Sequence, residues 1–249
     1  MRTIAASLLM LLPLAGCIQL EQTLTLKNDG SGQFAVEYSL SEQTIEQIRA
    51  MYKLRQDLDQ AAGRPAAVAP GARLLRLYLD PVEADLRNEL KPYERAGVTA
   101  EKLKVESRGS ERYVSLKLNF ASLTELAKTD LFRSYGFSLA RGPGGLYEMT
   151  HIAPGPKQAR NADYTDAEAT KLLAPVMGGF RAHVTAQVPG AIQKTNATRH
   201  SERTAVWTFD FADDPFAFVQ FQQADLRIVF DGRGLDLPEV KQEAAPSGL

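Results

Sequence analysis

The sequence contains very little cysteine and histidine. Its 249 residues include one cysteine, Cys17, and three histidines. A disulfide within the chain needs two cysteines and a thiolate metal site needs several, so the sequence excludes both. The histidines, His151, His183 and His200, are far apart, and neither an HExxH motif nor a closely spaced histidine pair is present. We therefore expect neither a metal ion nor another cofactor.

An excess of charge of either sign is also lacking. Lys plus Arg is 29 and Asp plus Glu is 30, which gives a formal net charge of −1 at pH 7. Nucleic-acid-binding domains usually carry a basic patch, and this sequence has no basic run. The composition, 44% hydrophobic and 24% charged, is typical of globular proteins rather than of disordered or fibrous ones. The sequence thus predicts a folded protein that does not bind nucleic acid.

No apolar run is long enough to cross a membrane, which takes about 20 apolar residues. The N-terminal run covers residues 4–14 and follows Arg2. A positive residue followed by a short apolar stretch is typical of a secretory signal peptide. A plain secretory signal with an incidental cysteine, and a buried N-terminal helix, are the alternatives.

The next residues, Leu14-Ala15-Gly16-Cys17, resemble the lipobox of bacterial lipoproteins. The resemblance implies that residues 1–16 are removed and that Cys17 carries a diacylglyceryl group and an N-terminal fatty acid such as palmitate. Two or three acyl chains hold a protein stably on a membrane, whereas one does so only marginally. An aspartate directly after the lipidated cysteine favours retention in the inner membrane. This sequence has Ile18 at that position, which does not favour retention. We therefore expect a lipid-anchored envelope protein, placed on the outer membrane and facing the periplasm if the host has two membranes.

Alternation of apolar and polar residues predicts β-hairpins. Residues 20–26 and 33–40 alternate in this way, and the glycine-containing stretch 28–32 between them favours a tight turn. Further predicted pairs are 102–106 with 113–120, 137–140 with 146–152, and 180–188 with 204–211, and a last strand is predicted over 226–230.

The segments between the hairpins predict helices over residues 42–62, 81–90, 122–126, 166–177 and 216–222. Hairpins with separate helices favour the α+β class, with a mainly antiparallel sheet and helices packed on one face. We expect a single domain over residues 17–231. A mobile loop is predicted at 63–73, and a disordered C-terminal tail at 232–249.

The sequence offers few candidates for catalysis. It has no GxSxG and no GxGxxG motif, and its only cysteine is the expected lipidation site. Acidic residues occur in pairs at predicted caps and turns, where capping and the helix dipole already favour them. These pairs are Asp163 with Asp166, Asp213 with Asp214, and Asp236 with Glu239. We expect no catalytic residues and no enzymatic activity.

Aromatic residues are concentrated near the C-terminal end of the predicted domain. They include Trp207, Phe209, Phe211, Phe216, Phe218 and Phe221. At strand spacing the first three share one face. One interpretation is a core layer beneath the last helix, and the other is an apolar groove that binds an acyl chain. Ligand sites are often concave and apolar, so the sequence alone leaves both open.

Three stretches resemble the LppM-type bacterial lipoprotein domain family. They are the lipobox cysteine leading into a strand and the Asp29-Gly30-Ser31-Gly32 turn, then Val188-Pro189-Gly190 followed by Thr195-Asn196-Ala197, and finally Val206-Trp207-Thr208-Phe209. The resemblance covers most of residues 17–231. It implies an envelope-anchored α+β domain, with lipid or glycolipid binding proposed for some members, and it implies no catalytic residues. Some members also have a C-terminal transmembrane helix, whereas this sequence ends in a polar tail.

These observations favour a non-enzymatic, lipid-anchored envelope protein that binds a lipid or another amphiphile near the membrane. The alternative is a structural lipoprotein that acts as a scaffold in envelope assembly. An enclosed apolar cavity would favour the first function and a flat apolar patch the second. A hydrolase would require a histidine beside a carboxylate and a hydroxyl. Pro189-Gly190 also fits a type II turn, in which the glycine has a positive φ.

Overall fold

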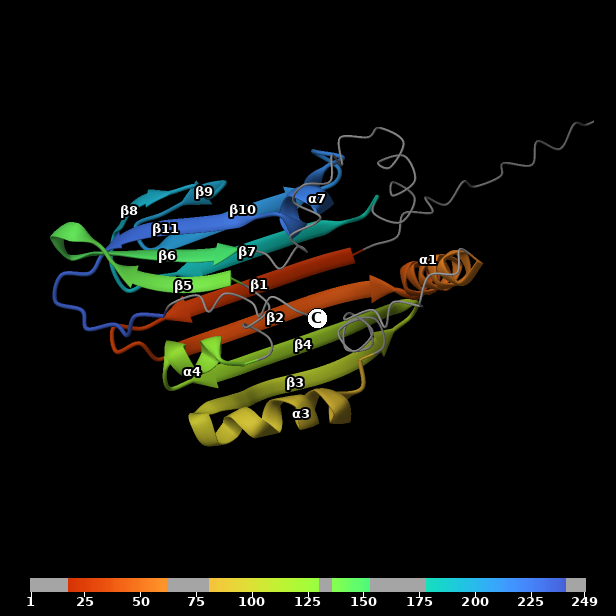
Figure 1. Ribbon diagram of the computed structural model, residues 1–249, viewed down its shortest axis with the longest axis horizontal. Coiled ribbons are helices and arrows are strands. Elements are labelled where there is room, and N and C mark those ends of the chain that lie inside the picture. Colours follow the sequence, from red (N-terminus) through yellow and green to blue (C-terminus); the bar gives the residue numbers. More distant parts are fainter. Residues whose placement is uncertain (1–17, 62–80, 130–135, 153–177, 241–249) are drawn as a thin grey trace, which may run out of the picture.

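The computed structural model describes residues 18–61, 81–129, 136–152 and 178–240. Two sheets form the framework (Figure 1). The large sheet has seven strands in the order β3-β4-β2-β1-β7-β10-β9, and the small sheet has four in the order β5-β6-β11-β8. The strands are β1 (Ile18–Leu26), β2 (Gly32–Ser41), β3 (Val98–Arg108), β4 (Glu111–Phe120), β5 (Gly136–Arg141), β6 (Leu146–Ile152), β7 (Arg181–Gln187), β8 (Ile192–Thr195), β9 (Arg199–His200), β10 (Thr204–Asp210) and β11 (Asp225–Asp231).

The helices are short apart from the first. They are α1 (Glu42–Ala61), α3 (Glu83–Leu90), α4 (Leu123–Ala127) and α7 (Ala217–Gln222), with the 3₁₀ turns η1 (Lys91–Ala96) and η2 (Pro143–Gly145). No helix in these parts of the chain is long and apolar enough to span a bilayer. The predicted loop at 63–73 and the predicted helix at 166–177 lie outside the described residues.

The first hairpin is confirmed, and its turn chemistry explains its register. β1 and β2 are antiparallel, with Leu24 opposite Phe34. In the turn, an Asp29 carboxylate oxygen accepts hydrogen bonds from the Ser31 backbone N–H at 3.0 Å and from the Ser31 hydroxyl at 2.7 Å. These bonds lower the pKa of Asp29. Gly30 has a φ of 79°, which favours glycine.

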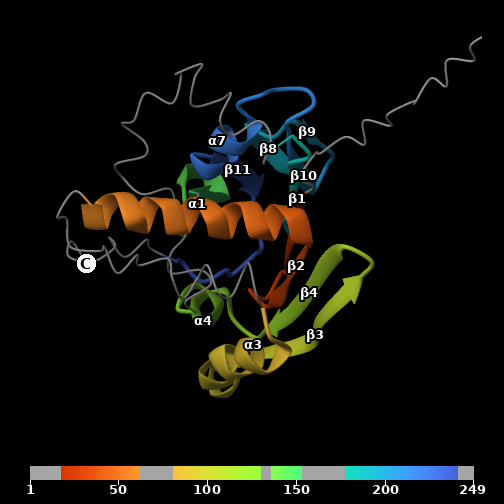
Figure 2. The ribbon, with the colours of Figure 1, turned by 90° about the vertical axis from the view of Figure 1, so that its right-hand side faces the viewer.

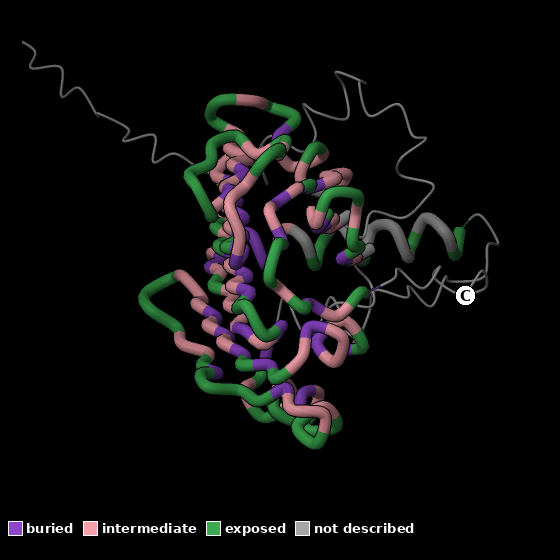
Figure 3. Tube along the Cα trace, turned by 90° about the vertical axis from the view of Figure 1, so that its left-hand side faces the viewer, coloured by how far each residue is buried: buried purple, intermediate pink, exposed green. Residues whose placement is uncertain are grey.

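The small sheet and the helices cover one face of the large sheet. Figure 2 shows α3, α4, α7 and β11 on the same side of the large sheet. Buried residues alternate with more exposed ones along these strands (Figure 3), because successive side chains point to opposite faces. The main core lies between the two sheets and draws on both, with Leu118 from β4 and Phe230 from β11 fully buried. The fold is therefore α+β, as the hairpin pattern predicts.

The large sheet is mixed rather than purely antiparallel. β1 pairs with β2 antiparallel on one side and with β7 parallel on the other, with Leu24 opposite Ala186. A parallel pair needs a long connection, and here the chain between β1 and β7 forms the other half of the large sheet and part of the small one. The alternation of apolar and polar residues predicts each strand, but it does not predict that β1 pairs with β7.

The structure corrects the expected extent of the disordered tail. Residues 232–240 pack against the small sheet, with Leu237 and Val240 buried. Val240 exchanges two backbone hydrogen bonds of 2.9 Å with Leu139 and so pairs with the outer edge of β5. The apolar side chains of this segment leave water when it packs on the sheet. This burial offsets the conformational entropy that the segment loses when it becomes ordered. Only residues 241–249 of the expected tail remain outside the described part of the chain.

Candidate functional site

Trp207 belongs to the main core rather than to a ligand site. Its side chain is 5% exposed and lies among the residues buried between the sheets. Its indole N–H donates a 3.1 Å hydrogen bond to the side-chain oxygen of Asn196. A buried indole usually finds such a partner, and here the partner fixes its position. We therefore leave Trp207 out of the candidate site.

Asn196 links the two sheets, a role that the sequence does not reveal. Its side-chain oxygen also accepts the Arg227 backbone N–H of β11 at 2.9 Å, and its amide donates to the Asp225 carbonyl at 2.6 Å. Next to it, the Thr195 hydroxyl donates to the Arg227 carbonyl at 2.7 Å. The Thr195-Asn196-Ala197 stretch is thus an inter-sheet clasp between Trp207 of β10 and the start of β11.

The Pro189-Gly190 pair has a different structural role from the one predicted. Gly190 is not among the glycines with positive φ, so the type II turn is wrong. A Cβ at this position would lie 1.7 Å from the Asp231 carbonyl oxygen. Glycine is required because the backbone of β11 passes too close for any side chain.

Phenylalanines from β10, α7 and the start of β7 form a second cluster at one end of the large sheet. We call Phe180, Phe209, Phe211, Phe218 and Phe221 the aromatic end cluster. Phe216 precedes the buried Ala217 in the chain but does not pack in this cluster. Phe180 is buried, and its ring centroid lies 5.2 Å from that of Phe218 and 5.7 Å from that of Phe221. Phe209 lies 5.5 Å from Phe221 in an edge-to-face arrangement. Four of the six residues predicted to line a ligand site therefore pack together, namely Phe209, Phe211, Phe218 and Phe221.

The aromatic end cluster is only partly buried. Apart from the buried Phe180, its members are half-buried, and the neighbouring Phe216 is 37% exposed. Among the large apolar side chains in the described ranges, only Phe216 and Val82 count as exposed. Exposed aromatic surface next to a buried ring is typical of a contact site rather than of a closed core.

Acidic residues fix the loop that carries Phe216. One oxygen of the Asp214 carboxylate accepts the Phe216 backbone N–H at 2.8 Å, and the other accepts the Gln220 side-chain amide at 2.6 Å. Asp210 accepts the Ala212 backbone N–H at 2.9 Å and the Arg181 guanidinium at 2.7 Å, and both bonds lower its pKa. Asp214 thus shapes the loop before α7, but the prediction that it caps the helix is wrong, because Phe216 takes the N-cap position and no side chain caps it.

The aromatic end cluster surrounds the first residues of β1. Ile18 and Leu20 are half-buried and pack against it. Figure 1 places the start of β1 at the same end of the large sheet as α7. Cys17 and the lipobox residues Leu14, Ala15 and Gly16 lie outside the described residues. The sequence nevertheless puts Cys17 one peptide bond before Ile18, so the expected lipid attachment point adjoins the cluster.

The three histidines do not meet one another. His151 lies in the small sheet beside Phe137, with ring centroids 6.3 Å apart, and burial lowers its pKa to about 4. His183 lies on the uncovered face of the large sheet, opposite Thr208 and Glu21, and His200 is exposed on β9. Within the described ranges, no three or more His, Cys, Asp or Glu side chains gather in a way that could hold a metal ion. Asp163 and Asp166 lie outside those ranges, and Asp236 and Glu239 are exposed.

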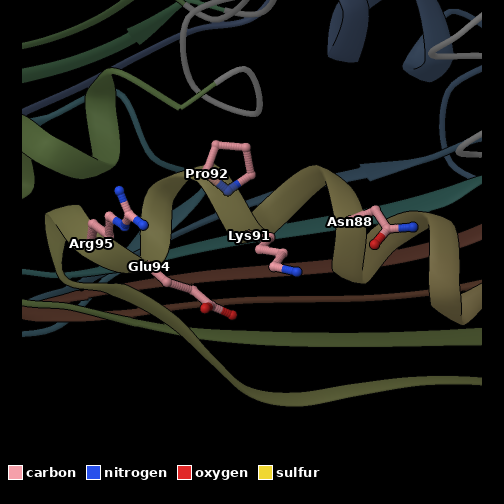
Figure 4. Close-up of a pocket in the computed structure, with 5 residues that line it drawn as sticks. All are labelled: Asn88, Lys91, Pro92, Glu94 and Arg95. Atoms are coloured by element: carbon pink, nitrogen blue, oxygen red, sulfur yellow. The ribbon is translucent and has the colours of Figure 1, made fainter.

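An open surface hollow of about 490 Å³ lies beside α3 and η1 (Figure 4). Its lining residues carry both signs of charge, from Lys91, Arg95 and Glu94 together with Asn88 and Pro92. All five residues are exposed. The hollow is open to solvent rather than enclosed, and it does not include any predicted site residue.

Comparison with known proteins gives little further guidance. No family model matches the chain, and no curated protein matches it. Among solved structures, the chain is similar to the NMR structure of the folded domain of the Mycobacterium tuberculosis LppM protein. The identity is 12%, the alignment covers 87% of this chain and 91% of that chain, and the TM-score is 0.40. A likeness at this level assigns no function to this chain.

Proposed function

We propose that this protein is a non-enzymatic, lipid-anchored envelope protein that binds a lipid or a similar amphiphile at the aromatic end cluster. The observation that carries the proposal is the position of the cluster. Ile18 and Leu20, which follow the expected lipidation site in the sequence, pack against the same cluster as the half-buried phenylalanine rings. A site in this position meets the membrane lipids that surround the anchor.

The chemistry of the cluster suits an acyl chain. Each CH₂ group that leaves water for an apolar surface contributes about 0.8 kcal/mol. Phe211, Phe216 and Phe218 offer such a surface on one side, while Phe180 and Ala217 are buried beneath them. Packing between the rings holds this surface in place before a ligand arrives, so little conformational entropy is lost on binding.

Native mass spectrometry of the full chain tests this proposal. The protein would be extracted from its membrane in a mild detergent, which is removed in the gas phase. We expect a lipid mass in addition to the covalent anchor. Phe218→Ala should reduce the lipid-bound fraction about tenfold, because the ring that packs on Phe180 is lost.

Tyr113→Ala is the matched control, since it removes an aromatic ring from β4 that stacks under Arg108 away from the cluster. This variant should keep the wild-type lipid occupancy. Equal occupancy in the two variants at unchanged thermal stability, or wild-type protein without any non-covalent lipid, would exclude the aromatic end cluster as a lipid site.

A further inference from the structure

The aromatic end cluster, the neighbouring Phe216 and the attachment point of the N-terminal segment lie on the same end of the molecule. Ile18 packs against the cluster, and consecutive Cα atoms are about 3.8 Å apart, so the chain leaves the described part of the fold at this end. The apolar stretch at residues 4–14 and the expected lipidation site Cys17 precede this point in the sequence. An anchor at Cys17 would therefore tether the protein by this end of the sheet.

We propose that this end of the molecule docks on the bilayer that holds the anchor, with Phe216 in the lipid interface and Phe211 and Phe218 at its border. The proposal rests on the lipid anchor of the proposed function. It adds that the amphiphile reaches the aromatic end cluster from the leaflet rather than from the aqueous phase. Phenylalanine side chains contribute to binding at a membrane surface because their rings exchange water for apolar contact.

The charges on this end indicate which type of lipid surface fits. The loop that carries Phe216 contains Asp213 and Asp214, and Asp210 at the end of β10 neutralises Arg181. Basic residues that attract anionic headgroups are missing from this loop, residues 211–218. The docking contact is thus apolar, and anionic lipids do not strengthen it.

Docking sets the orientation of the large sheet. β1 begins at the docked end and runs away from it, and its nine residues span about 30 Å at the usual rise of a strand. The turn that contains Asn28 therefore stands well clear of the membrane. Figure 1 shows this turn at the opposite end of the sheet from α7.

A single-tryptophan experiment on the full, lipidated chain tests the proposal. Trp207→Phe removes the native fluorophore, and Phe216→Trp or Asn28→Trp then places one indole at either end of the molecule. Both proteins would be reconstituted in phosphatidylcholine vesicles with and without lipids brominated on the acyl chain. We expect blue-shifted emission at position 216 and roughly threefold stronger quenching there than at position 28. Replacing a third of the lipid by phosphatidylglycerol should not raise this ratio, because the loop has no basic residue that would attract anionic headgroups.

Hydrogen exchange of the unmodified protein provides a second measurement that does not depend on how the variants fold. Amides of residues 211–221 should exchange more slowly in vesicles than in detergent-free solution of the enzymatically deacylated chain, while those of residues 27–31 should not change. Equal quenching at positions 216 and 28, or unchanged exchange in residues 211–221, would overturn docking. If native mass spectrometry still finds a bound lipid in that case, the proposed function stands and only the docking geometry is wrong.

Discussion

At the scale of single residues, burial determines the ionisation of His151. The side chain lies inside the small sheet, and burial alone lowers its pKa from 6.5 to about 4. In the folded protein the imidazole is therefore neutral down to about pH 4, whereas in the unfolded chain it takes up a proton below pH 6.5. This difference links the stability of the fold to pH.

The sign of that link follows from proton uptake. Between pH 6.5 and pH 4 the unfolded state binds more protons at His151, so the contribution of this residue to stability is complete above pH 6.5 and falls as the pH falls. We expect a loss of about 3 kcal/mol in the free energy of unfolding across this interval. His151→Gln should flatten the dependence. Urea unfolding from pH 4 to pH 8 measures it, and the exposed His200→Gln is the control that should retain the wild-type slope.

At the scale of elements, the inter-sheet clasp fixes how β10 and β11 sit against each other. The sequence shows β10 and β11 as two predicted strands, but their local patterns do not reveal that they belong to different sheets. Asn196 connects them through the Trp207 indole and the backbone of β11. One side-chain amide thus bonds to strands of both sheets, in addition to the core that packs between them.

Asn196→Ala should therefore destabilise the protein by about 2 kcal/mol, because it leaves the Trp207 N–H and the Arg227 backbone N–H without their acceptor. Chemical denaturation gives the change in the free energy of unfolding. Asn119→Ala is the matched control, since Asn119 is exposed and its side chain bonds to the side chains of Gln33 and Glu101 on the uncovered face. A loss for Asn196→Ala no larger than for this control would show that the clasp does not hold the sheets together.

At the scale of the whole molecule, the C-terminal segment completes the small sheet. β5 is an edge strand, and an unprotected edge strand can pair with another chain. Val240 occupies part of this edge, and Leu237 is buried while its backbone N–H and carbonyl bond to the Tyr147 hydroxyl. The end of the described chain therefore contributes both to the core and to the protection of the sheet.

We expect Leu237→Ala to cost about 3 kcal/mol of stability, as is usual for a buried leucine in a packed core. Thermal unfolding followed by circular dichroism measures the loss. The neighbouring Asp236→Ala removes an exposed side chain and should change stability by less than about 0.5 kcal/mol. Indistinguishable melting curves for the two variants would mean that residues 232–240 are as disordered as their composition suggests.

Local patterns were sufficient for the parts of the fold that depend on neighbouring residues. The strict alternation in β1 and β2 predicts both strands, and Gly30 with Asp29 predicts the turn, because side-chain period and turn chemistry act within a few residues. Ser41 before α1 is confirmed as a cap, since its hydroxyl accepts the Thr44 backbone N–H at 3.1 Å. β8 escaped prediction because a four-residue strand carries too short an alternation to stand out.

The sequence by itself determined most of the strands, the hairpins and the α+β class, all of which depend on short-range pattern. The anchoring of Cys17 stays a prediction. Only the tertiary structure decided that β1 and β7 pair in parallel and that residues 232–240 join the core. It also decided that Trp207 is buried while Phe216 is exposed, although both belong to one run of aromatic residues. The physical reason is that burial depends on which distant segments cover a side chain, and residues at the same spacing in sequence meet different partners in space.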